Sequence, residues 1–319
     1  MTPEAEILGG QRAGVYGHAS MATDGKNVVW IDATNGVLET PLVGAASAAP
    51  ITLQATTNSQ LGWGDIAMAG GVVVWSAWDA NNPMMLWTAK DGASLKAFGA
   101  GSVANSSGDV PSGLALDATG ANAYFVDAQN LLDVPMAPGL YQCAVATATC
   151  ARLHSMAAAP VFGLAGDVAV GAGGAFFTDT AAQTVYRQNV GTVVSQQENP
   201  SRVVIDSTSV YWANIDVPDG GDSTFTLRKA PQAAGSSATT LVGPVAAALW
   251  GMATDGANVY YAAESGFAAH GGSLLYVPVG GGTPQSLKDG QQAIAVAAAG
   301  GIIVWIDNKT NTIDAIAAP

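Results

Sequence analysis

The stretch MATDGKNVVW (residues 21–30) decides the fold, because variants of it return along the whole chain. Each variant begins with a short apolar run, passes through a turn rich in Gly, Asp or Asn, and ends in an apolar-aromatic pair. Self-similarity at a period of roughly 20–50 residues is the signature of a repeat architecture. The six other copies are IAMAGGVVVW (66–75), LALDATGANAYF (114–125), VAVGAGGAFF (168–177), VVIDSTSVYW (203–212), MATDGANVYY (252–261) and IAVAAAGGIIVW (294–305).

The aromatic residue that ends each copy sets the spacing of the repeat. Successive anchors lie 45, 50, 52, 35, 49 and 44 residues apart, and a four-stranded propeller blade takes roughly 40–50 residues. The two apolar runs of each copy predict a β-hairpin, and two further runs complete four strands. We therefore predict an all-β, seven-bladed β-propeller that occupies residues 1–319 as a single domain. The blade anchors are Trp30, Trp75, Phe125, Phe177, Trp212, Tyr261 and Trp305.

The seventh copy has only three strand-like runs before the sequence ends at Pro319. The apolar segment AEILGGQ (5–11) precedes the first copy and is the candidate for the missing strand. A strand from the N-terminus in the last blade would close the ring and leave only short, protected sheet edges.

The ends of several copies carry a recognisable motif. FFTD (176–179), YFVD (124–127), VWID (304–307) and YWAN (211–214) resemble the repeats of secreted bacterial β-propellers of the YWTD and NHL types. The resemblance covers essentially the whole chain and implies a propeller. It implies little about function, because propellers host binding, scaffolding and enzyme chemistry alike.

The composition excludes some partners. The chain has 24 acidic and 11 basic residues, a net charge of −13, and only 11% charged residues. Nucleic acids and anionic membrane surfaces are bound through clusters of Lys and Arg, so neither is expected as a partner. No apolar run has the length needed to span a bilayer.

Cys143 and Cys150 are the only cysteines, with six residues between them in a strand-turn-strand segment. They can face each other across a hairpin, and we predict a disulfide. The alternative is two separate buried thiols. A disulfide implies an oxidising compartment, so the predicted location is extracytoplasmic: periplasmic, cell-surface or secreted.

Loops on one face of a propeller surround the mouth of its central channel, and the longer loops of this chain map to that face. Aligning the first strands of the blades gives two rings of residues there. The second ring combines two carboxylates with one guanidinium, which suits either a mutually neutralising cluster or an anchor for a polar ligand. The first ring is His18, Trp63, Pro111, Ala165, Pro200, Leu249 and Gln291, and the second is Ser20, Asp65, Gly113, Asp167, Arg202, Gly251 and Ala293.

Three tryptophans, Trp63, Trp78 and Trp250, lie outside the repeat positions and on the same predicted face. Exposed aromatic rings bind sugars, rings and partner side chains, and the alternative is that they pack between blades. The histidines His18, His154 and His270 fall in blades spread around the ring, which disfavours a shared metal.

Acidic residues follow the second strand of each blade. Such carboxylates suit either calcium binding or the capping of turns, and we favour turn capping, with no cofactor required. The set is Asp32, Asp79, Asp127, Asp179, Asp216, Glu264 and Asp307.

The sequence contains no Gly-x-Ser-x-Gly, His-Glu-x-x-His or phosphate-loop motif. We therefore predict a non-catalytic binding module that uses the loop face to bind a protein or a carbohydrate. The ligand-binding candidates are His18, Trp63, Asp65, Trp78, Asp167, Arg202, Trp250 and Gln291. One alternative is a propeller enzyme of the lactonase, lyase or cyclase kind with a site at the channel mouth. Another is a structural component of an envelope or coat.

Overall fold

The structure is a computed structural model, and it describes the strands and most of the turns that join them. Within these residues there are strands and turns, and no helix is long and apolar enough to cross a membrane. The described residues are 7–8, 21–32, 36–42, 50–54, 62–78, 83–89, 96–97, 112–127, 138–156, 166–216, 223–264, 272–307, 309–310 and 312–319.

The strands form four-stranded antiparallel sheets. Six of these sheets are blades made of four consecutive strands. These are β2 (Met21–Thr23), β3 (Asn27–Asp32), β4 (Gly36–Pro41) and β5 (Ile51–Gln54); β6 (Gly62–Ala69), β7 (Val72–Trp78), β8 (Pro83–Ala89) and β9 (Lys96–Ala97); β10 (Ser112–Leu116), β11 (Asn122–Asp127), β12 (Gly139–Ala144) and β13 (Thr149–Ser155); β14 (Val168–Gly171), β15 (Gly174–Asp179), β16 (Thr184–Arg187) and β17 (Gly191–Val194); β18 (Pro200–Ile205), β19 (Ser209–Asp216), β20 (Thr224–Pro231) and β21 (Thr239–Ala246); β22 (Ala248–Thr254), β23 (Asn258–Glu264), β24 (Gly272–Pro278) and β25 (Gln285–Lys288).

The remaining sheet is composite. It joins β26 (Ala293–Ala299), β27 (Ile302–Asp307) and β28 (Thr312–Ala317) to β1 (Ile7–Leu8) from the other end of the chain. The predicted count of seven blades, with the ring closed by a strand over residues 5–11, is therefore wrong. Six blades are complete within continuous segments, and β1 contributes two residues, which pair with Ile313 and Thr312.

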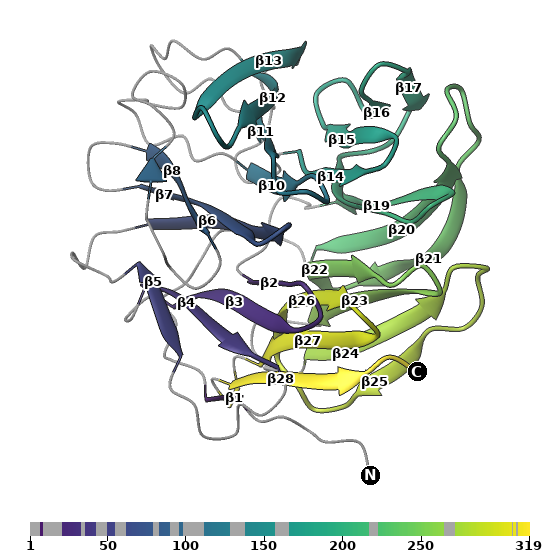
Figure 1. Ribbon diagram of the computed structural model, residues 1–319. Coiled ribbons are helices and arrows are strands. Elements are labelled where there is room, and N and C mark those ends of the chain that lie inside the picture. Colours follow the sequence, from purple (N-terminus) through teal and green to yellow (C-terminus); the bar gives the residue numbers. More distant parts are fainter. Residues whose placement is uncertain are drawn as a thin grey trace.

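The sheets are arranged around a common centre (Figure 1). The innermost strands are β2, β6, β10, β14, β18, β22 and, in the composite sheet, β26. Each innermost strand contacts the innermost strand of the next sheet, and β26 contacts β2. The two ends of the chain therefore meet mainly by packing of sheet against sheet. Val28 and Trp30 of the first blade share a buried cluster with Val304 and Ile306 of the composite sheet.

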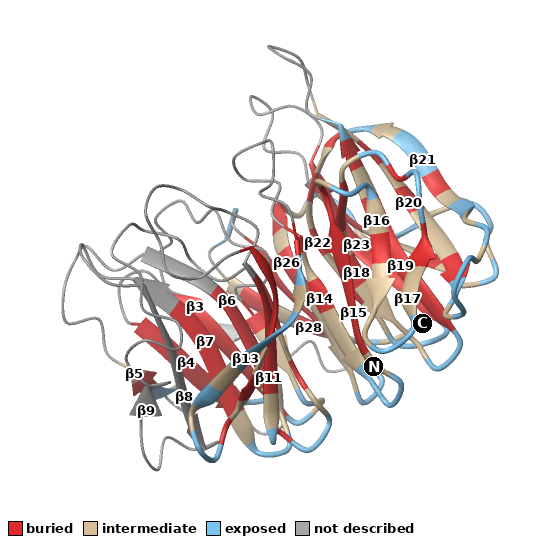
Figure 2. Cartoon of the chain, turned by 90° about the horizontal axis from the view of Figure 1, so that it is seen from above, coloured by how far each residue is buried: buried red, intermediate tan, exposed pale blue. Residues whose placement is uncertain are grey.

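The second strand of each sheet explains why the repeat is apolar on both sides. Successive side chains of a strand point to opposite faces, and all six residues of β3, red in Figure 2, are buried. In β3, Val28 and Trp30 pack toward the composite sheet, whereas Val29 and Ile31 pack toward the next blade. The anchor aromatics fill these seams: six of them are less than 2% exposed, and Trp30 is 3% exposed.

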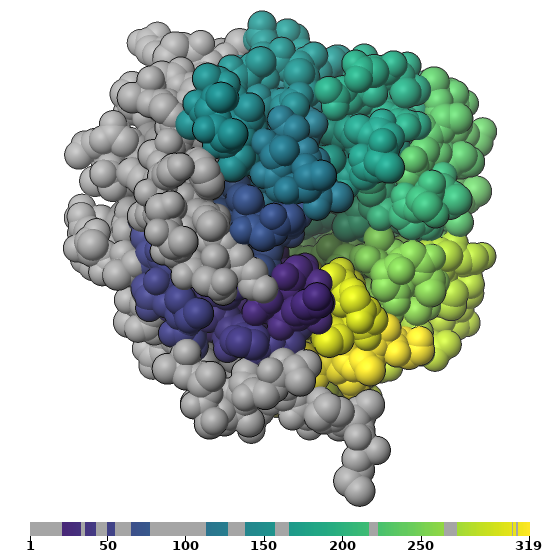
Figure 3. Space-filling model, in the orientation of Figure 1, coloured from purple at the N-terminus to yellow at the C-terminus, as the bar shows by residue number. Residues whose placement is uncertain are grey.

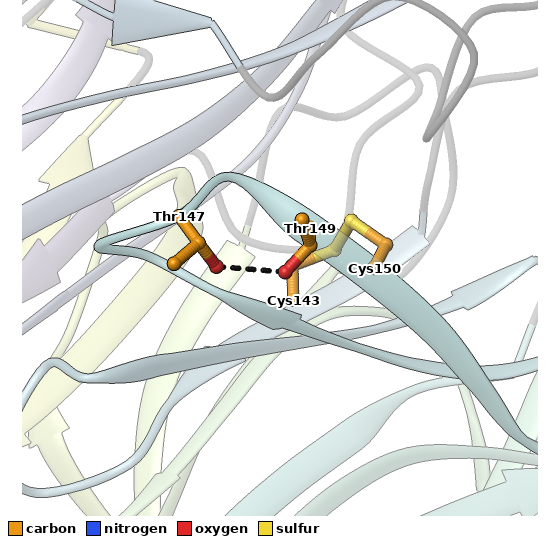
Figure 4. Close-up of a disulfide and its surroundings, with 4 residues drawn as sticks. All are labelled: Cys143, Thr147, Thr149 and Cys150. Atoms are coloured by element: carbon orange, nitrogen blue, oxygen red, sulfur yellow. Dashed lines mark hydrogen bonds between the residues drawn. A yellow bond between two sulfur atoms is a disulfide. The ribbon is translucent and has the colours of Figure 1, made fainter.

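The predicted disulfide is present. Cys143 on β12 lies directly opposite Cys150 on β13, and their Sγ atoms are bonded across the hairpin, with a Cα–Cα distance of 3.9 Å (Figure 4). In the turn that joins these strands, the hydroxyls of Thr147 and Thr149 are hydrogen-bonded at 2.7 Å. The disulfide therefore links β13, the outermost strand of this blade, to β12.

Candidate functional site

The candidate site lies where the innermost strands begin. In each blade, the anchor aromatic pairs with one residue of the innermost strand, and the site position is the residue just before that partner. Trp75, for example, pairs with Ile66, and Asp65 holds the site position. Strand pairing is irregular there: the register shifts around Asp65 in β6, Gly113 in β10 and Arg202 in β18. Such bulges re-aim a side chain and free a backbone N–H for another partner. Asp65, Gly113, Asp167 and Arg202 occupy this position in four consecutive blades, and we call them the inner-ring residues. The space-filling view shows a hollow at the middle of the ring (Figure 3).

Asp65 links its blade to the next one. Its side chain is 1% exposed, and its Oδ2 accepts a short hydrogen bond from the Gly113 N–H of the neighbouring innermost strand. The Asp65 N–H donates to the Ser76 hydroxyl at 3.0 Å, which fixes the bulge to β7. Asp65 is therefore held in place by its own blade while its carboxylate contacts the next.

Asp167 repeats this arrangement two blades further on. Its Oδ2 accepts from the Val203 N–H of the next blade and its Oδ1 from the Val168 N–H, both at 2.8 Å. Burial and, second, the charge of Asp65 raise the pKa of Asp167 to about 7, although the two N–H donors oppose that rise. At neutral pH the protonated and ionised forms of this carboxyl group are therefore both populated.

Gly113 lies between the two carboxyl groups. Its φ of +58° is a conformation that glycine adopts without strain. A Cβ at this position would come within 2.6 Å of Asp167 Oδ1, so any side chain would displace that carboxyl group. The glycine thus allows Asp65 and Asp167 to approach the same strand.

Arg202 stands apart from both aspartates. Its Nε and Nη1 atoms are buried and have no hydrogen-bond partner, and the described residues include no ion pair to it. Desolvation lowers its pKa to about 10, and neither aspartate contributes to that shift. Of the two interpretations that the sequence left open, the mutually neutralising cluster is therefore not what the structure forms.

The composite sheet corrects the alignment of the rings. Val296 pairs with the anchor Trp305, and a register shift lies between Ala293 and Ala295. The residues equivalent to Leu249 and Gly251 are therefore Ala293 and Ala295, where the alignment had used Gln291 and Ala293. Gln291 lies before the strand, and its Oε1 accepts a hydrogen bond from Trp305 Nε1 at 3.3 Å.

Trp250 is tied into a seam between sheets. Its Nε1 donates to Glu264 Oε2 at 3.0 Å, and Gln292 Nε2 donates to Glu264 Oε1 at 3.1 Å. The Trp250 ring packs, partly buried, against the cluster that contains Trp305. This geometry fits packing between blades. The Glu264–Gln292 contact was missed in the sequence, where Glu264 was grouped with the strand-end acids and Gln292 was not singled out.

Several of the predicted residues are described only in part or lie outside the described residues. His18, His270 and Asp79 lie outside the described residues, and of Trp63, Trp78 and Asp127 only the backbone, in β6, β7 and β11, is described. His154 packs against the rings of Tyr186 and Phe177, at centroid distances of 4.2 and 5.2 Å. Burial lowers the His154 pKa, opposed by the charge of Asp179.

Two of the strand-end acids, Asp179 and Asp307, contact main-chain donors. Asp179 Oδ1 accepts from the Ala182 N–H at 2.9 Å, and Asp307 Oδ1 accepts from the N–H groups of Gln292 and Lys309 at 3.0 and 2.9 Å. Within the described part of the chain, no three His, Cys, Asp or Glu residues are grouped so as to hold a metal ion. The contacts of Asp179 and Asp307 are those of residues that cap turns.

The sequence matches no protein-family model and no curated protein. Solved structures match the fold. A GH74 enzyme of Niastella koreensis is similar over 98% of this chain and 53% of its own, with 15% identity and a TM-score of 0.68. Virginiamycin B lyase from Staphylococcus aureus is similar over the whole of both chains, with 10% identity and a TM-score of 0.67.

A prolyl endopeptidase structure is similar over 95% of this chain and 51% of its own, with 10% identity and a TM-score of 0.59. This chain therefore spans about half the length of the GH74 enzyme and of the endopeptidase. At these identities the likeness shows a β-propeller and nothing finer.

Proposed function

We propose that the protein is a non-catalytic binding module whose ligand enters the mouth of the central channel and contacts the inner-ring residues. The observation that carries this proposal is that the ring position is not repeated. The anchors recur from blade to blade, whereas this position holds Asp65, Gly113, Asp167, Arg202, Gly251 and Ala295 in succession. A position with a purely structural role in a repeat would hold similar residues in each blade, whereas a site that binds one ligand needs a different residue at each point of contact.

The chemistry of the ring supports a polar ligand. It combines carboxyl groups with a guanidinium group that has buried, unpartnered nitrogen atoms. Small-molecule sites typically present a few such polar groups in an apolar concavity, and the seams beside Val168 and Val203 are apolar. A carbohydrate or a protein loop at the channel mouth meets these requirements.

We place the protein outside the cytoplasm, in the periplasm, at the cell surface or secreted. The Cys143–Cys150 disulfide supports this location, because disulfides persist in oxidising compartments. The chain has 24 acidic and 11 basic residues, and this acidic balance supports a partner other than nucleic acid. The FFTD and YFVD motifs support kinship with secreted propellers of the YWTD and NHL types.

One observation favours a second candidate function, an enzyme with its site at the same place. Asp167, with a pKa raised to about 7 by burial and by Asp65, has the value that general acid-base catalysis at neutral pH needs. If the site is catalytic, a bound ligand is converted on incubation, and Asp167→Asn abolishes the conversion without abolishing binding. Mass spectrometry of the incubated ligand distinguishes the two functions.

The binding proposal is tested by NMR on protein labelled at valine methyl groups. Val168 and Val203 report on the ring, and Val210 and Val259, near the turns at the opposite end of the blades, are matched controls. A panel of oligosaccharides, short peptides and small organic acids is screened. We expect at least one class to shift the signals of Val168 and Val203 and leave the controls in place. A panel that shifts only the controls, or no valine at all, contradicts the proposal.

A further inference from the structure

Arg202 has a backbone conformation that suits glycine. Its φ is +44°, and among the described strand residues it is the only non-glycine residue with positive φ. The other non-glycine examples, such as Gln183 and Asn199, lie in turns or bends or between elements. Gly113 occupies the equivalent place in its own blade, with a φ of +58°. A bulky residue in this conformation strains the backbone, and such strain persists where the surroundings or the function require it.

The same side chain carries a second unfavourable feature. Nε and Nη1 of Arg202 are buried without a partner. Burying the polar atoms of a charged group without hydrogen bonds is costly. The remaining nitrogen, Nη2, also has no hydrogen bond among the described residues and is not among the buried atoms, so the guanidinium group faces a space that solvent reaches.

Two other arginines show what a structural role looks like in this protein. Arg187 donates to the carbonyl oxygens of Gly173 and Gln232 and lies over the Phe176 ring, 5.0 Å from its centroid. Arg228 shares with Arg202 a buried Nε without a partner, but it donates through Nη1 to the Thr240 hydroxyl at 2.6 Å. Arg202 has no contact of this kind, although it lies in an innermost strand.

The nearby carboxylates do not neutralise it. Asp167 directs Oδ1 and Oδ2 at the N–H groups of Val168 and Val203, and Asp65 directs Oδ2 at Gly113. These main-chain bonds hold the acidic groups to the strands. Within the part of the chain that the structure describes, no group accepts from these donors.

We propose that Arg202 binds an oxyanion, a carboxylate or a phosphate group, of the ligand at the channel mouth; this rests on the proposed binding function. The planar guanidinium fork presents parallel N–H donors that match two oxygens of such a group. The bound oxyanion would accept from Nη2, the nitrogen that solvent reaches, and from Nε or Nη1 as the second donor of the fork. With a net charge of −13, the protein as a whole repels anions, so the attraction has to be local, as a single buried guanidinium provides.

The test compares wild type with Arg202→Gly and Arg202→Lys, and Arg228→Lys serves as the matched control away from the ring. Glycine relieves the φ strain and removes the guanidinium, so this variant folds. Lysine keeps the charge and loses the fork. Inorganic phosphate and acetate are titrated separately at constant ionic strength, while the arginine Nε–H signals and the melting temperature are recorded.

We expect phosphate, acetate or both to shift the Arg202 Nε–H signal saturably and to raise the melting temperature of wild type and of Arg228→Lys. Affinity falls at least about tenfold in Arg202→Lys and vanishes in Arg202→Gly. Without anion, Arg202→Gly melts about 2–4 °C above wild type, because the strain and the unpaired charge are gone. A response to phosphate alone assigns a tetrahedral oxyanion, and a response to acetate assigns a carboxylate.

Three results overturn the inference: no anion shifts the Arg202 signal, the anion effect persists in Arg202→Gly, or Arg202→Gly melts below wild type. The last result would make Arg202 a structural residue. A neutral ligand that shifts the Val168 and Val203 methyl signals equally in wild type and Arg202→Gly would overturn this inference and leave the proposed binding function standing.

Discussion

The two ends of the innermost strands use the same residue type in opposite ways. At the turn end, Asp206 accepts hydrogen bonds from the N–H groups of Thr208 and Ser209 and from the Tyr211 hydroxyl, at 2.6, 2.7 and 2.6 Å. Partial burial acts to raise the Asp206 pKa, and these bonds outweigh it, so that the pKa lies below its usual value. At the ring end, burial and Asp65 raise the pKa of Asp167 to about 7.

The turn arrangement is found in four of the blades, whereas the ring arrangement is shared by Asp65 and Asp167. Asp255 accepts from Ala257, Asn258 and the Tyr260 hydroxyl in the same way as Asp206, and its pKa is likewise lowered by these bonds against partial burial. The turn carboxylate, which recurs as Asp24, Asp117, Asp206 and Asp255, is part of the fold. A carboxylate that occurs at selected ring positions, beside an unpaired arginine, is a candidate for function.

The largest expected effect concerns the turn that carries the disulfide. Replacing both Cys143 and Cys150 by Ser should lower the free energy of unfolding by about 2–3 kcal/mol, because the closed loop no longer restricts the unfolded chain. Denaturant unfolding with and without reductant measures it. Equal stability of the oxidised and reduced wild-type protein would contradict the prediction. The ring signals of Val168 and Val203 should be unchanged.

Asp206→Ala should destabilise the fold by about 2 kcal/mol, because two N–H groups and the Tyr211 hydroxyl lose a charged acceptor. Asp206→Asn, which keeps an acceptor oxygen, is the matched control and should lose less. Thermal unfolding of the pair measures the difference. If both variants were as stable as wild type, the repeated turn carboxylates would not be structural.

The pH dependence should show two opposite trends. Asp117, Asp206 and Asp255 have lowered pKa values: partial burial opposes the shift and hydrogen bonds outweigh it. Their stabilisation is present above their unfolded pKa of 3.8 and is lost as pH falls further. The raised pKa of Asp167 has the opposite effect: the contribution of Asp167 to the stability of the fold is greatest below pH 3.8 and declines as pH rises to about 7.

We therefore expect the melting temperature to fall as pH rises from about 4 to 7, and to fall as pH is lowered below about 4. We call the first decline the upper limb and the second the lower limb. Asp167→Asn should flatten the upper limb and leave the lower limb unchanged. An upper limb with the same slope in Asp167→Asn would show that Asp167 is not the group responsible.

The smallest expected effect is that of a chelator. Since Asp179 and Asp307 direct carboxylate oxygens at main-chain N–H groups, EDTA should leave the melting temperature within about 1 °C. Metal analysis of protein purified without affinity metal provides an independent measurement. Stoichiometric calcium, with a chelator-induced drop in melting temperature, would show that these acids bind a cation.

The parts that the sequence predicted correctly depend on neighbours in the chain. The β-propeller architecture follows from the repeat, and the Cys143–Cys150 pairing follows from a seven-residue separation within one hairpin. The count of seven blades and the closing strand were wrong, because the number of N-terminal residues that pair with β28 depends on packing between the two ends of the chain.

The parts that were missed depend on contacts between sheets. The placement of Gln291 failed because the seventh copy, IAVAAAGGIIVW (294–305), lacks the turn Asp that fixes the alignment of other copies. The Glu264–Gln292 contact spans 28 residues and two sheets. The isolation of Arg202 follows from where the carboxylates of Asp65 and Asp167 are directed, and no local pattern encodes that.

The most direct test of this contrast is a pH titration of protein carrying ¹³C-labelled aspartate carboxyl groups, with signals assigned by the Asp167→Asn and Asp206→Asn variants. In one sample, the account predicts a pKa of about 7 for Asp167 and a value below 3.8 for Asp206. An Asp167 that titrates at or below the value of Asp206 would contradict it, since the ring would then be electrostatically like the turns.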